Sequence, residues 1–267
     1  MTEQSSTHAI IVFDIDGVIR DVGGSYRRAL ADTVEYFTNY AYRPTPVDID
    51  QLKAEGIWNN DWEASQEFIY RYFEAQGEAR DQLQFDYQTI VTFFQSRYRG
   101  TDPNNWNGYI CDEPLLVHPR YLEELTKAGI LWGFFSGATR GSATYVLEKR
   151  LGLKLPILVA MEDAPGKPDP TGLFTAVQHL EEKFSSKCKV NTTVIYVGDT
   201  VADMYTVIKA RELEPKRNWV GIGVLPPHVQ KTPSRREAYA ELLLNSGAEL
   251  VFCNVEDLTP AQITTLL

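Results

Sequence analysis

A run of five apolar residues, 9–13, ends abruptly in Asp14, Asp16 and Gly17. An unbroken apolar run of this length is typical of a strand that is buried on both faces of a parallel sheet. In open α/β sheets, ligands bind at the edge formed by the carboxyl ends of the strands. The two acids therefore predict a ligand site at that edge, provided that other strands deliver polar groups to the same place.

Two later apolar runs deliver polar groups in the same way. Residues 130–135 precede Ser136, and residues 193–197 are separated from Asp199 by one glycine. Each run is followed by an amphipathic helical pattern. Lys167 lies between the two runs, in a loop whose prolines suit a helix start. This alternation predicts an α/β fold with a parallel sheet and a polar site at one edge.

A long insertion separates the first predicted strand from the second. Residues 21–114 contain no convincing strand, and helical patterns appear near 47–55, 60–76 and 82–99. A β-α-β crossover needs only about 30 residues. We therefore predict an inserted all-helical domain at 21–114, and an α/β core domain formed by residues 1–20 and 115–267.

The composition argues against two classes of partner. The 267 residues carry a net charge of −10, whereas a nucleic-acid surface needs clustered lysine and arginine. A small anionic substrate is still compatible with this charge, because a bound metal reverses the local sign. No apolar stretch approaches the roughly 20 residues that cross a bilayer, so we expect no membrane partner.

The remaining bulk properties indicate a soluble protein. The N-terminus lacks the basic and apolar blocks of a signal peptide. Cys111, Cys188 and Cys253 are odd in number and far apart, which fits neither a disulfide framework nor a metal site. We therefore expect a cytoplasmic protein, a monomer or homodimer, whose partner is a small molecule.

The order of the polar groups resembles the haloacid dehalogenase (HAD) superfamily of aspartate-nucleophile phosphatases. Residues 14–21 read Asp-x-Asp-Gly-Val-x-x-Asp, the first of four family motifs. Ser136 stands in the second motif, Lys167 in the third, and Asp199 with Asp203 in the fourth. A helical insertion between the first two motifs resembles the C1-capped members, such as phosphoglycolate phosphatase and β-phosphoglucomutase. The resemblance implies a Rossmann-like, doubly wound parallel sheet with a helical cap domain.

The resemblance implies a role for each acid. Asp14 would attack a phosphomonoester and form an aspartyl-phosphate, with Asp16 as general acid and base. The negative charge of both reactants requires a metal, and Mg²⁺ prefers oxygen ligands of the kind that Asp14, Asp199 and Asp203 supply. By the same resemblance, the backbone carbonyl of Asp16 is a further ligand and Asp203 acts through water.

The other motif residues would hold the phosphoryl group. The Ser136 hydroxyl and the backbone N–H groups of Gly137 and Ala138 would bind its oxygens at a helix start. Lys167 would neutralise the charge shared by the phosphoryl group and the nucleophile. Each residue also has a structural alternative: Ser136 as a helix cap, Lys167 as a solvated loop charge, and Asp203 as an acid favoured by the helix dipole.

The residues that would choose the substrate are less sharply indicated. Trp58, Asn59 and Asn60 lie in a loop of the insertion, where C1-capped relatives read the leaving group. The alternative is a turn whose tryptophan packs within the insertion. Arg20 stands where relatives usually carry an apolar residue, and either contacts an anionic leaving group or is an exposed hinge residue.

Several other activities share parts of this pattern. Dehalogenase relatives lack the second acid and need no metal, so Asp16 and Asp199 argue against that reaction. A phosphonatase would need a Schiff-base lysine in the insertion, where Lys53 is the sole lysine. A phosphomutase shares every motif, and a non-catalytic scaffold would have lost one of them. We expect a Mg²⁺-dependent phosphatase acting on a small phosphomonoester, with the mutase and the scaffold as alternatives.

Overall fold

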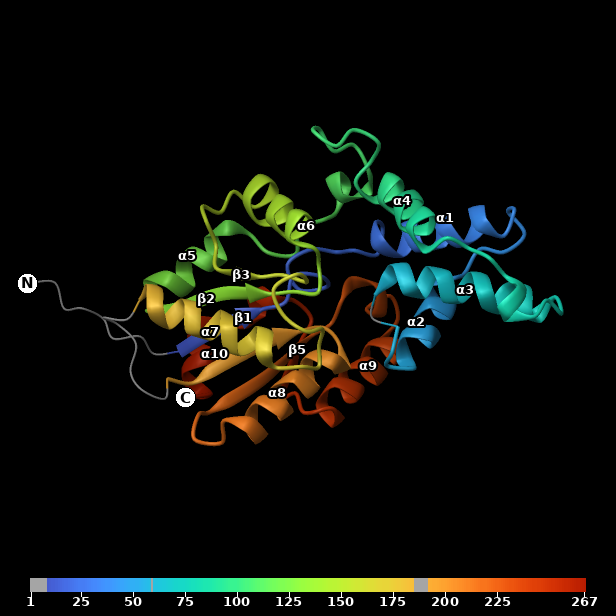
Figure 1. Cartoon of the computed structure of the whole chain (residues 1–267). Coiled ribbons are helices and arrows are strands. Elements are labelled where there is room, and N and C mark those ends of the chain that lie inside the picture. The colour runs from blue at the N-terminus through green and yellow to red at the C-terminus, as the bar shows by residue number, and fades with distance from the viewer. Residues whose placement is uncertain (1–8, 59, 185–191) are drawn as a thin grey trace, which may run out of the picture. The chain divides into compact units, whose positions relative to one another are not determined.

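The computed structural model describes residues 9–58, 60–184 and 192–267 (Figure 1). The chain divides into two compact units. Met1–Asp21 and Leu115–Leu267 form the first, which we call the α/β unit, and Val22–Pro114 form the second, the helical unit. The polypeptide therefore leaves the α/β unit once, after its first strand, and returns to it once.

The α/β unit is built on a six-stranded sheet in which every neighbouring pair is parallel. The strands are β1 (Ala9–Phe13), β2 (Ile130–Phe135), β3 (Leu158–Val159), β4 (Val194–Gly198), β5 (Trp219–Val224) and β6 (Leu250–Phe252). Their order is β3-β2-β1-β4-β5-β6. This is the doubly wound order, in which the strand sequence reverses between β1 and β4. The predicted fold class is confirmed.

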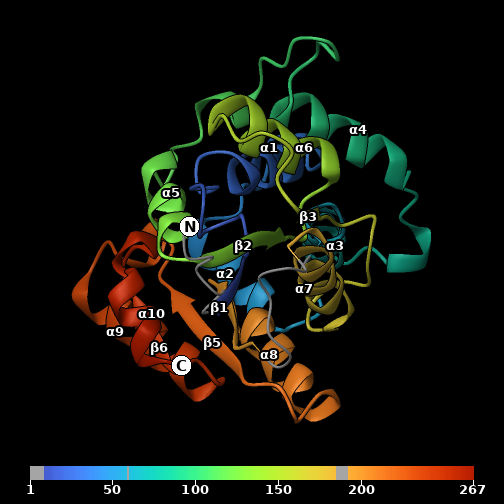
Figure 2. The same ribbon diagram turned by 90° about the vertical axis from the view of Figure 1, so that its left-hand side faces the viewer.

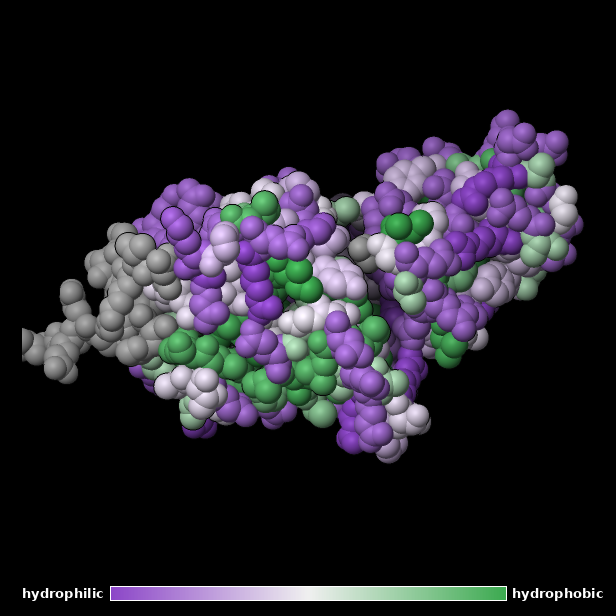
Figure 3. All heavy atoms as spheres, turned by 90° about the horizontal axis from the view of Figure 1, so that it is seen from below, coloured by the Kyte–Doolittle hydropathy of each residue, from purple (hydrophilic) through white to green (hydrophobic). Residues whose placement is uncertain are grey.

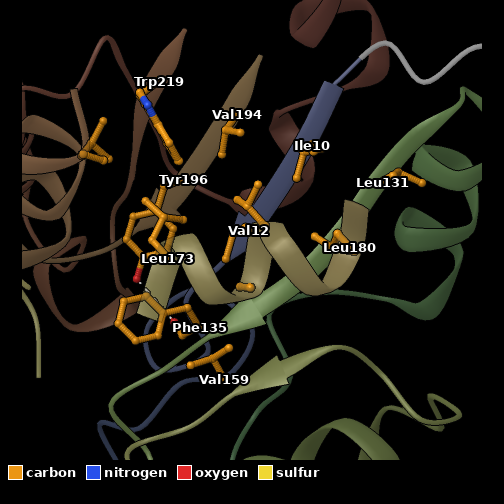
Figure 4. Close-up of a cluster of buried hydrophobic side chains, with 14 residues drawn as sticks. Ile10, Val12, Leu131, Phe135, Val159, Leu173, Leu180, Val194, Tyr196 and Trp219 are labelled. Atoms are coloured by element: carbon orange, nitrogen blue, oxygen red, sulfur yellow. Dashed lines mark hydrogen bonds between the residues drawn. The ribbon is translucent and has the colours of Figure 1, made fainter. Parts of the chain in front are cut away.

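Helices pack against both faces of this sheet (Figure 2). They are α5 (Pro119–Lys127), α6 (Arg140–Thr144), α7 (Thr171–Lys183), α8 (Val201–Leu213), α9 (Pro233–Asn245) and α10 (Pro260–Thr265). Side chains of a strand point alternately to its two faces. On β1, Ile10 and Val12 join a buried cluster with Leu173 and Leu180 of α7 (Figure 4). The Phe13 ring instead meets Tyr121 of α5.

The helical unit contains α1 (Tyr26–Phe37), α2 (Pro46–Ala54), α3 (Asp61–Ala75) and α4 (Tyr87–Tyr98). Aromatic rings hold α1 against α4: Tyr26 stacks on Tyr98 with ring centroids 4.0 Å apart, and Tyr36 stacks on Phe93 at 4.2 Å. Such ring pairs add stability beyond the area that they bury. The Tyr26–Tyr98 pair thus contributes to the core of this unit, whereas Tyr36 remains 46% exposed.

Two helices differ from the sequence expectation at their ends. The pattern near 82–99 predicted one continuous helix, but α4 begins only at Tyr87, because the Asp86 side chain accepts the Thr89 N–H and caps it. The amphipathic pattern that follows residues 130–135 spans 139–151 and predicts one unbroken helix. Instead α6 passes at Tyr145–Arg150 into a wider π-helical segment. Side-chain caps and packing decided these ends, which periodicity alone does not register.

The surface seen in Figure 3 is largely hydrophilic, with a hydrophobic patch on the α/β unit. Among the helices that the structure describes, none combines the length and the apolar character needed to span a membrane. The buried apolar side chains come from both the sheet and the helices, and all five residues of β1 are buried.

Candidate active site

The polar groups predicted from the sequence meet at the carboxyl edge of the sheet. Asp14 follows β1 directly, and its backbone N–H donates to the Val197 carbonyl at 2.8 Å, which continues the pairing of β1 with β4. Ser136 follows β2 and donates its N–H to Val159 of β3 at 3.0 Å. Asp199 follows β4. Backbone hydrogen bonds between strands therefore fix the positions of Asp14 and Ser136.

Gly17 permits the turn after β1 to approach the end of β4. Its φ of +74° lies in the left-handed region that favours glycine. A Cβ atom at this position would lie 2.0 Å from Asp199 Oδ2. No side chain fits in that space, so only glycine allows the first motif and the Asp199 carboxylate to come so close.

Lys167 connects two of the acids. Its ammonium lies 2.9 Å from Asp14 Oδ2 and donates to Asp203 Oδ1 at 2.6 Å, with the lysine side chain only 11% exposed. Burial alone would lower the pKa of Lys167, but the two carboxylates raise it well above its ordinary value. Lys167 therefore stays charged, and the interpretation as a solvated loop lysine is wrong.

Asp203 is held on both of its oxygens. Oδ1 accepts from Lys167 and, at 3.0 Å, from the Tyr196 hydroxyl. Oδ2 accepts the backbone N–H of Thr200 at 2.9 Å and its hydroxyl at 2.6 Å, as part of a capping box at the start of α8. Burial would raise the pKa of Asp203, but Lys167 and the Thr200 donors lower it below its ordinary value.

Asp199 has the opposite environment. Its side chain is buried, and among the described residues no group donates a hydrogen bond to its carboxylate. Burial, reinforced by Asp203 and Asp14, raises its pKa well above the usual range. A buried carboxylate without donors is costly unless a cation neutralises it.

Asp14 shares this need for a cation. Its Oδ1 accepts the Ile15 N–H at 2.7 Å. Burial raises the pKa of Asp14 to about 7. The charge of Lys167 lowers this pKa, whereas the charges of Asp203 and Asp16 raise it further. One carboxylate oxygen from each of Asp14, Asp199 and Asp203 lies within 4.8 Å of the others. A hard divalent cation such as Mg²⁺ fits this all-oxygen donor set and would offset its excess negative charge.

The turn after β2 presents a free hydroxyl hydrogen and backbone donors. Ser136 is buried, and its Oγ accepts the Ala138 N–H at 3.1 Å, so the hydroxyl hydrogen remains able to donate elsewhere. Gly137 is exposed between them. Thr139 rather than Ser136 is the N-cap residue of α6, and its side chain makes no capping hydrogen bond. The turn is thus compatible with phosphate binding.

Two aromatic rings around Lys167 were missed by the sequence reasoning. The ammonium lies 5.5 Å from the ring centroids of both Phe135 and Tyr196, which are neighbours in the buried cluster of Figure 4. Rings at this distance attract a cation through their electron-rich faces. The available signal was the strand alternation, which places Phe135 on the same face of the sheet as Val12.

Arg20 is not the exposed hinge residue that one of the two sequence interpretations predicted. The side chain is completely buried, and its Nε and Nη2 atoms both lie 2.6 Å from Asp16 Oδ1. Arginine is almost never fully buried without a charged partner. The expectation of exposure was wrong because residues 15–20 fold back on themselves, with the Arg20 N–H donating to the Ile15 carbonyl.

The proposed substrate-reading loop lies in the helical unit. The Asn60 side chain accepts the Trp62 N–H at 2.9 Å and caps α3, and Trp58 donates to Glu55 at 2.8 Å. Asn59 lies outside the described residues. Both Trp58 and Asn60 therefore have local structural partners, and their role toward a substrate stays a prediction.

An all-parallel doubly wound sheet with a carboxylate, lysine and serine site at its carboxyl edge defines a class of α/β enzymes. Comparison with known families agrees: residues 8–210 match the model of the haloacid dehalogenase-like hydrolases. The match covers most of the chain, which therefore belongs to that family. The predicted resemblance is confirmed.

Individual relatives are more distant. The protein named imidazoleglycerol-phosphate dehydratase of Phytophthora nicotianae is 27% identical over 265 residues, covering 94% of this chain and 52% of that protein. The chain thus spans about half the length of this relative.

Solved structures of similar fold include phosphatase Tt82 of Thermococcus thioreducens, with 24% identity, a TM-score of 0.63, and coverage of 80% of this chain and 92% of that one. A HAD family hydrolase of Deinococcus radiodurans, solved with phosphate and sodium, has 16% identity, a TM-score of 0.62 and 99% coverage of both chains.

Proposed function

We propose that this protein is a Mg²⁺-dependent phosphatase that hydrolyses a small soluble phosphomonoester through an aspartyl-phosphate. The observation that carries the proposal is the pairing of Asp14 with Lys167 beside Asp199, a buried carboxylate to which no described group donates. Membership of the hydrolase family and the similarity to a phosphatase and to a phosphate-bound hydrolase support it.

Asp14 is the proposed nucleophile. Its carboxylate oxygen attacks phosphorus, the bond from phosphorus to the leaving oxygen breaks, and the phosphoryl group is held by Asp14 as an acyl phosphate. Asp14 and Asp199 would hold Mg²⁺ directly, and Asp203 would hold it through water. The backbone carbonyl of Asp16 would be a further ligand. When bound, the cation neutralises charge on the carboxylates and the phosphoryl oxygens. Lys167, charged and fixed beside Asp14, stabilises the same charge from the protein side.

Asp16 is the proposed general acid and base. Its side chain is 29% exposed, in contrast to the buried Asp14. It would protonate the departing alcohol in the first step and then take a proton from the water that hydrolyses the aspartyl-phosphate. The second step releases inorganic phosphate and restores the Asp14 carboxylate and the protonated form of Asp16.

The turn after β2 would hold the phosphoryl oxygens. The Ser136 hydroxyl hydrogen is available as a donor while its oxygen accepts the Ala138 N–H, and Gly137 adds an exposed backbone N–H. Trp58, Asn59 and Asn60 of the helical unit, proposed as a cap domain, would contact the leaving group. We expect the protein to act on a free metabolite in the cytoplasm, as a monomer or homodimer.

Phosphate release from a substrate panel tests the proposal. The panel contains sugar, glycolate, nucleotide, amino-acid and imidazole-bearing phosphates together with 4-nitrophenyl phosphate, each with Mg²⁺ and with EDTA. We expect Mg²⁺-dependent turnover that Asp14→Asn abolishes, and acid-quenched enzyme that carries phosphate on the peptide containing Asp14. A folded wild-type protein that releases no phosphate from any ester would refute the phosphatase assignment.

The same panel distinguishes the alternatives. A phosphomutase would interconvert sugar phosphates while releasing little phosphate, and would still label Asp14. A non-catalytic scaffold would neither release phosphate nor label Asp14. No residue of the four motifs is lost in this chain, so the enzymatic alternatives are favoured over the scaffold.

A further inference from the structure

We propose that Arg20 is the positioning residue of Asp16: it holds one carboxylate oxygen, Oδ1, so that the other, Oδ2, is the oxygen that transfers protons. This inference rests on the proposed phosphatase function. It concerns a residue at a variable position of the first motif, whose side chain is completely buried.

The contact has an asymmetric geometry. Arg20 Nε donates a charge-assisted hydrogen bond to Asp16 Oδ1 at 2.6 Å, and Nη2 lies at the same distance from that oxygen as an ion-pair contact. Among the described residues, no group donates to Asp16 Oδ2, and the side chain remains 29% exposed. The carboxylate is therefore fixed through one oxygen and open at the other, as a group that exchanges protons with substrate and water must be.

The backbone makes this clamp rigid. The N–H groups of Ile19 and Arg20 both donate to the Ile15 carbonyl, at 2.8 and 3.1 Å, and Gly17 donates to the Arg20 carbonyl at 2.9 Å. Leu116 donates to the Ile19 carbonyl at 2.8 Å, where the chain returns to the α/β unit. Arg20 thus projects from a closed loop that is anchored on both sides, which suits a group that orients another.

A lysine would not replace this arrangement. A guanidinium presents several donors in a fixed plane, whereas an ammonium on a flexible stem acts as a point charge. We therefore expect Arg20→Lys to restore part of the orientation and Arg20→Met to lose it.

Substituted phenyl phosphates test the proposal, because they share a shape but differ in how strongly the leaving oxygen needs a proton. The measured quantity is kcat/KM with Mg²⁺, which reports the formation of the aspartyl-phosphate. 4-Nitrophenyl phosphate leaves readily without a general acid, whereas phenyl phosphate does not. If Arg20 orients Asp16, Arg20→Met lowers kcat/KM for phenyl phosphate about ten-fold more than for 4-nitrophenyl phosphate, within the usual range of general acid catalysis.

Four further variants make the result specific. Asp16→Asn gives the same selective loss, and the double variant Arg20→Met/Asp16→Asn is no worse than Asp16→Asn alone, because Arg20 acts through Asp16. Arg20→Lys lies between wild type and Arg20→Met. Arg120→Met, which removes an exposed arginine paired with Glu124 four residues along, leaves both rates unchanged.

A measurement on the wild-type protein stands beside the kinetics in case Arg20→Met does not fold. In nitrogen-labelled protein, the Arg20 Nε–H resonance should exchange with water far more slowly than that of Arg120, and Asp16→Asn should shift it. An Arg20 Nε–H that exchanges as fast as that of Arg120 would overturn the clamp.

The kinetic outcomes separate the two proposals. An active enzyme in which Arg20→Met lowers both esters by the same factor, or changes neither, overturns the positioning role and leaves the phosphatase assignment intact. A wild-type protein that hydrolyses no ester overturns the phosphatase assignment and the role of Arg20 together.

Discussion

Lys167 donates a 2.6 Å hydrogen bond to Asp203 Oδ1, and this contact divides the acids of the site into two kinds. Asp203 has donors on both oxygens and a lowered pKa. Asp199, buried beside it, has no donor among the described residues and a strongly raised pKa. One carboxylate is satisfied by the protein, and the other needs a ligand from outside the protein.

The first prediction concerns stability without metal. Because the fold disfavours the ionised form of Asp199, Asp199→Asn should stabilise the metal-free protein at pH 8, by about 1 kcal/mol. Asp203→Asn should destabilise it by about 3 kcal/mol, because it removes one of the two buried carboxylates that neutralise Lys167 and leaves Asp14 as the other. Urea unfolding in EDTA measures both. The two variants control for each other. Changes of the same sign in the free energy of unfolding would contradict the distinction between Asp199, which has no donor among the described residues, and Asp203, which has donors on both oxygens.

The second prediction concerns pH and Mg²⁺. Burial raises the pKa of Asp14 from 3.8 to about 7. Between these values the native state keeps a proton that the unfolded chain has lost, so this group's contribution to stability falls as the pH rises toward 7. The same proton competes with a metal. Mg²⁺ should therefore raise the Tm more at pH 8 than at pH 5.5, whereas NaCl of equal ionic strength should not. Equal shifts at both pH values would argue against Asp14 as a ligand.

The third prediction tests the close approach at Gly17. In Gly17→Ala, the new Cβ would displace the Asp199 carboxylate, so the Mg²⁺-dependent rise in Tm should disappear and activity should fall about 100-fold. Gly152→Ala is the matched control. Gly152 has nearly the same φ, +76°, but nothing within 4 Å of an added Cβ. It should cost about 1 kcal/mol of stability and no activity. Similar activity in the two variants would contradict the steric argument.

The fourth prediction concerns Tyr196. Tyr196→Phe removes the hydroxyl that donates to Asp203, and should lower stability by about 1 kcal/mol and kcat by about five-fold as Lys167 loosens. Tyr121→Phe removes another buried hydroxyl, which donates to the Leu258 carbonyl at 3.0 Å on the opposite face of the sheet. It should lower stability equally and leave kcat unchanged. An equal loss of kcat in both variants would show that the effect of Tyr196→Phe comes from losing a buried hydroxyl in general and not from losing the contact with Asp203.

Much of the site could be predicted from the chain because its determinants are local. Five consecutive apolar residues before Asp14 are typical of a buried strand, and a parallel sheet brings the carboxyl ends of such strands together. The order of Asp14, Ser136, Lys167 and Asp199 then predicted both the fold and the edge that carries the site. The sequence by itself determined these features.

Only the tertiary structure decided how these groups share charge. Arg20 follows Asp16 by four residues, yet nothing local predicts that the loop closes and buries the guanidinium against one oxygen. Tyr196 and Asp203 meet because α8 starts immediately beyond β4, which brings a strand residue and a helix residue onto the same lysine. Burial and neighbouring charge set the pKa values of Asp14, Asp199 and Asp203, and both depend on residues far apart in the chain.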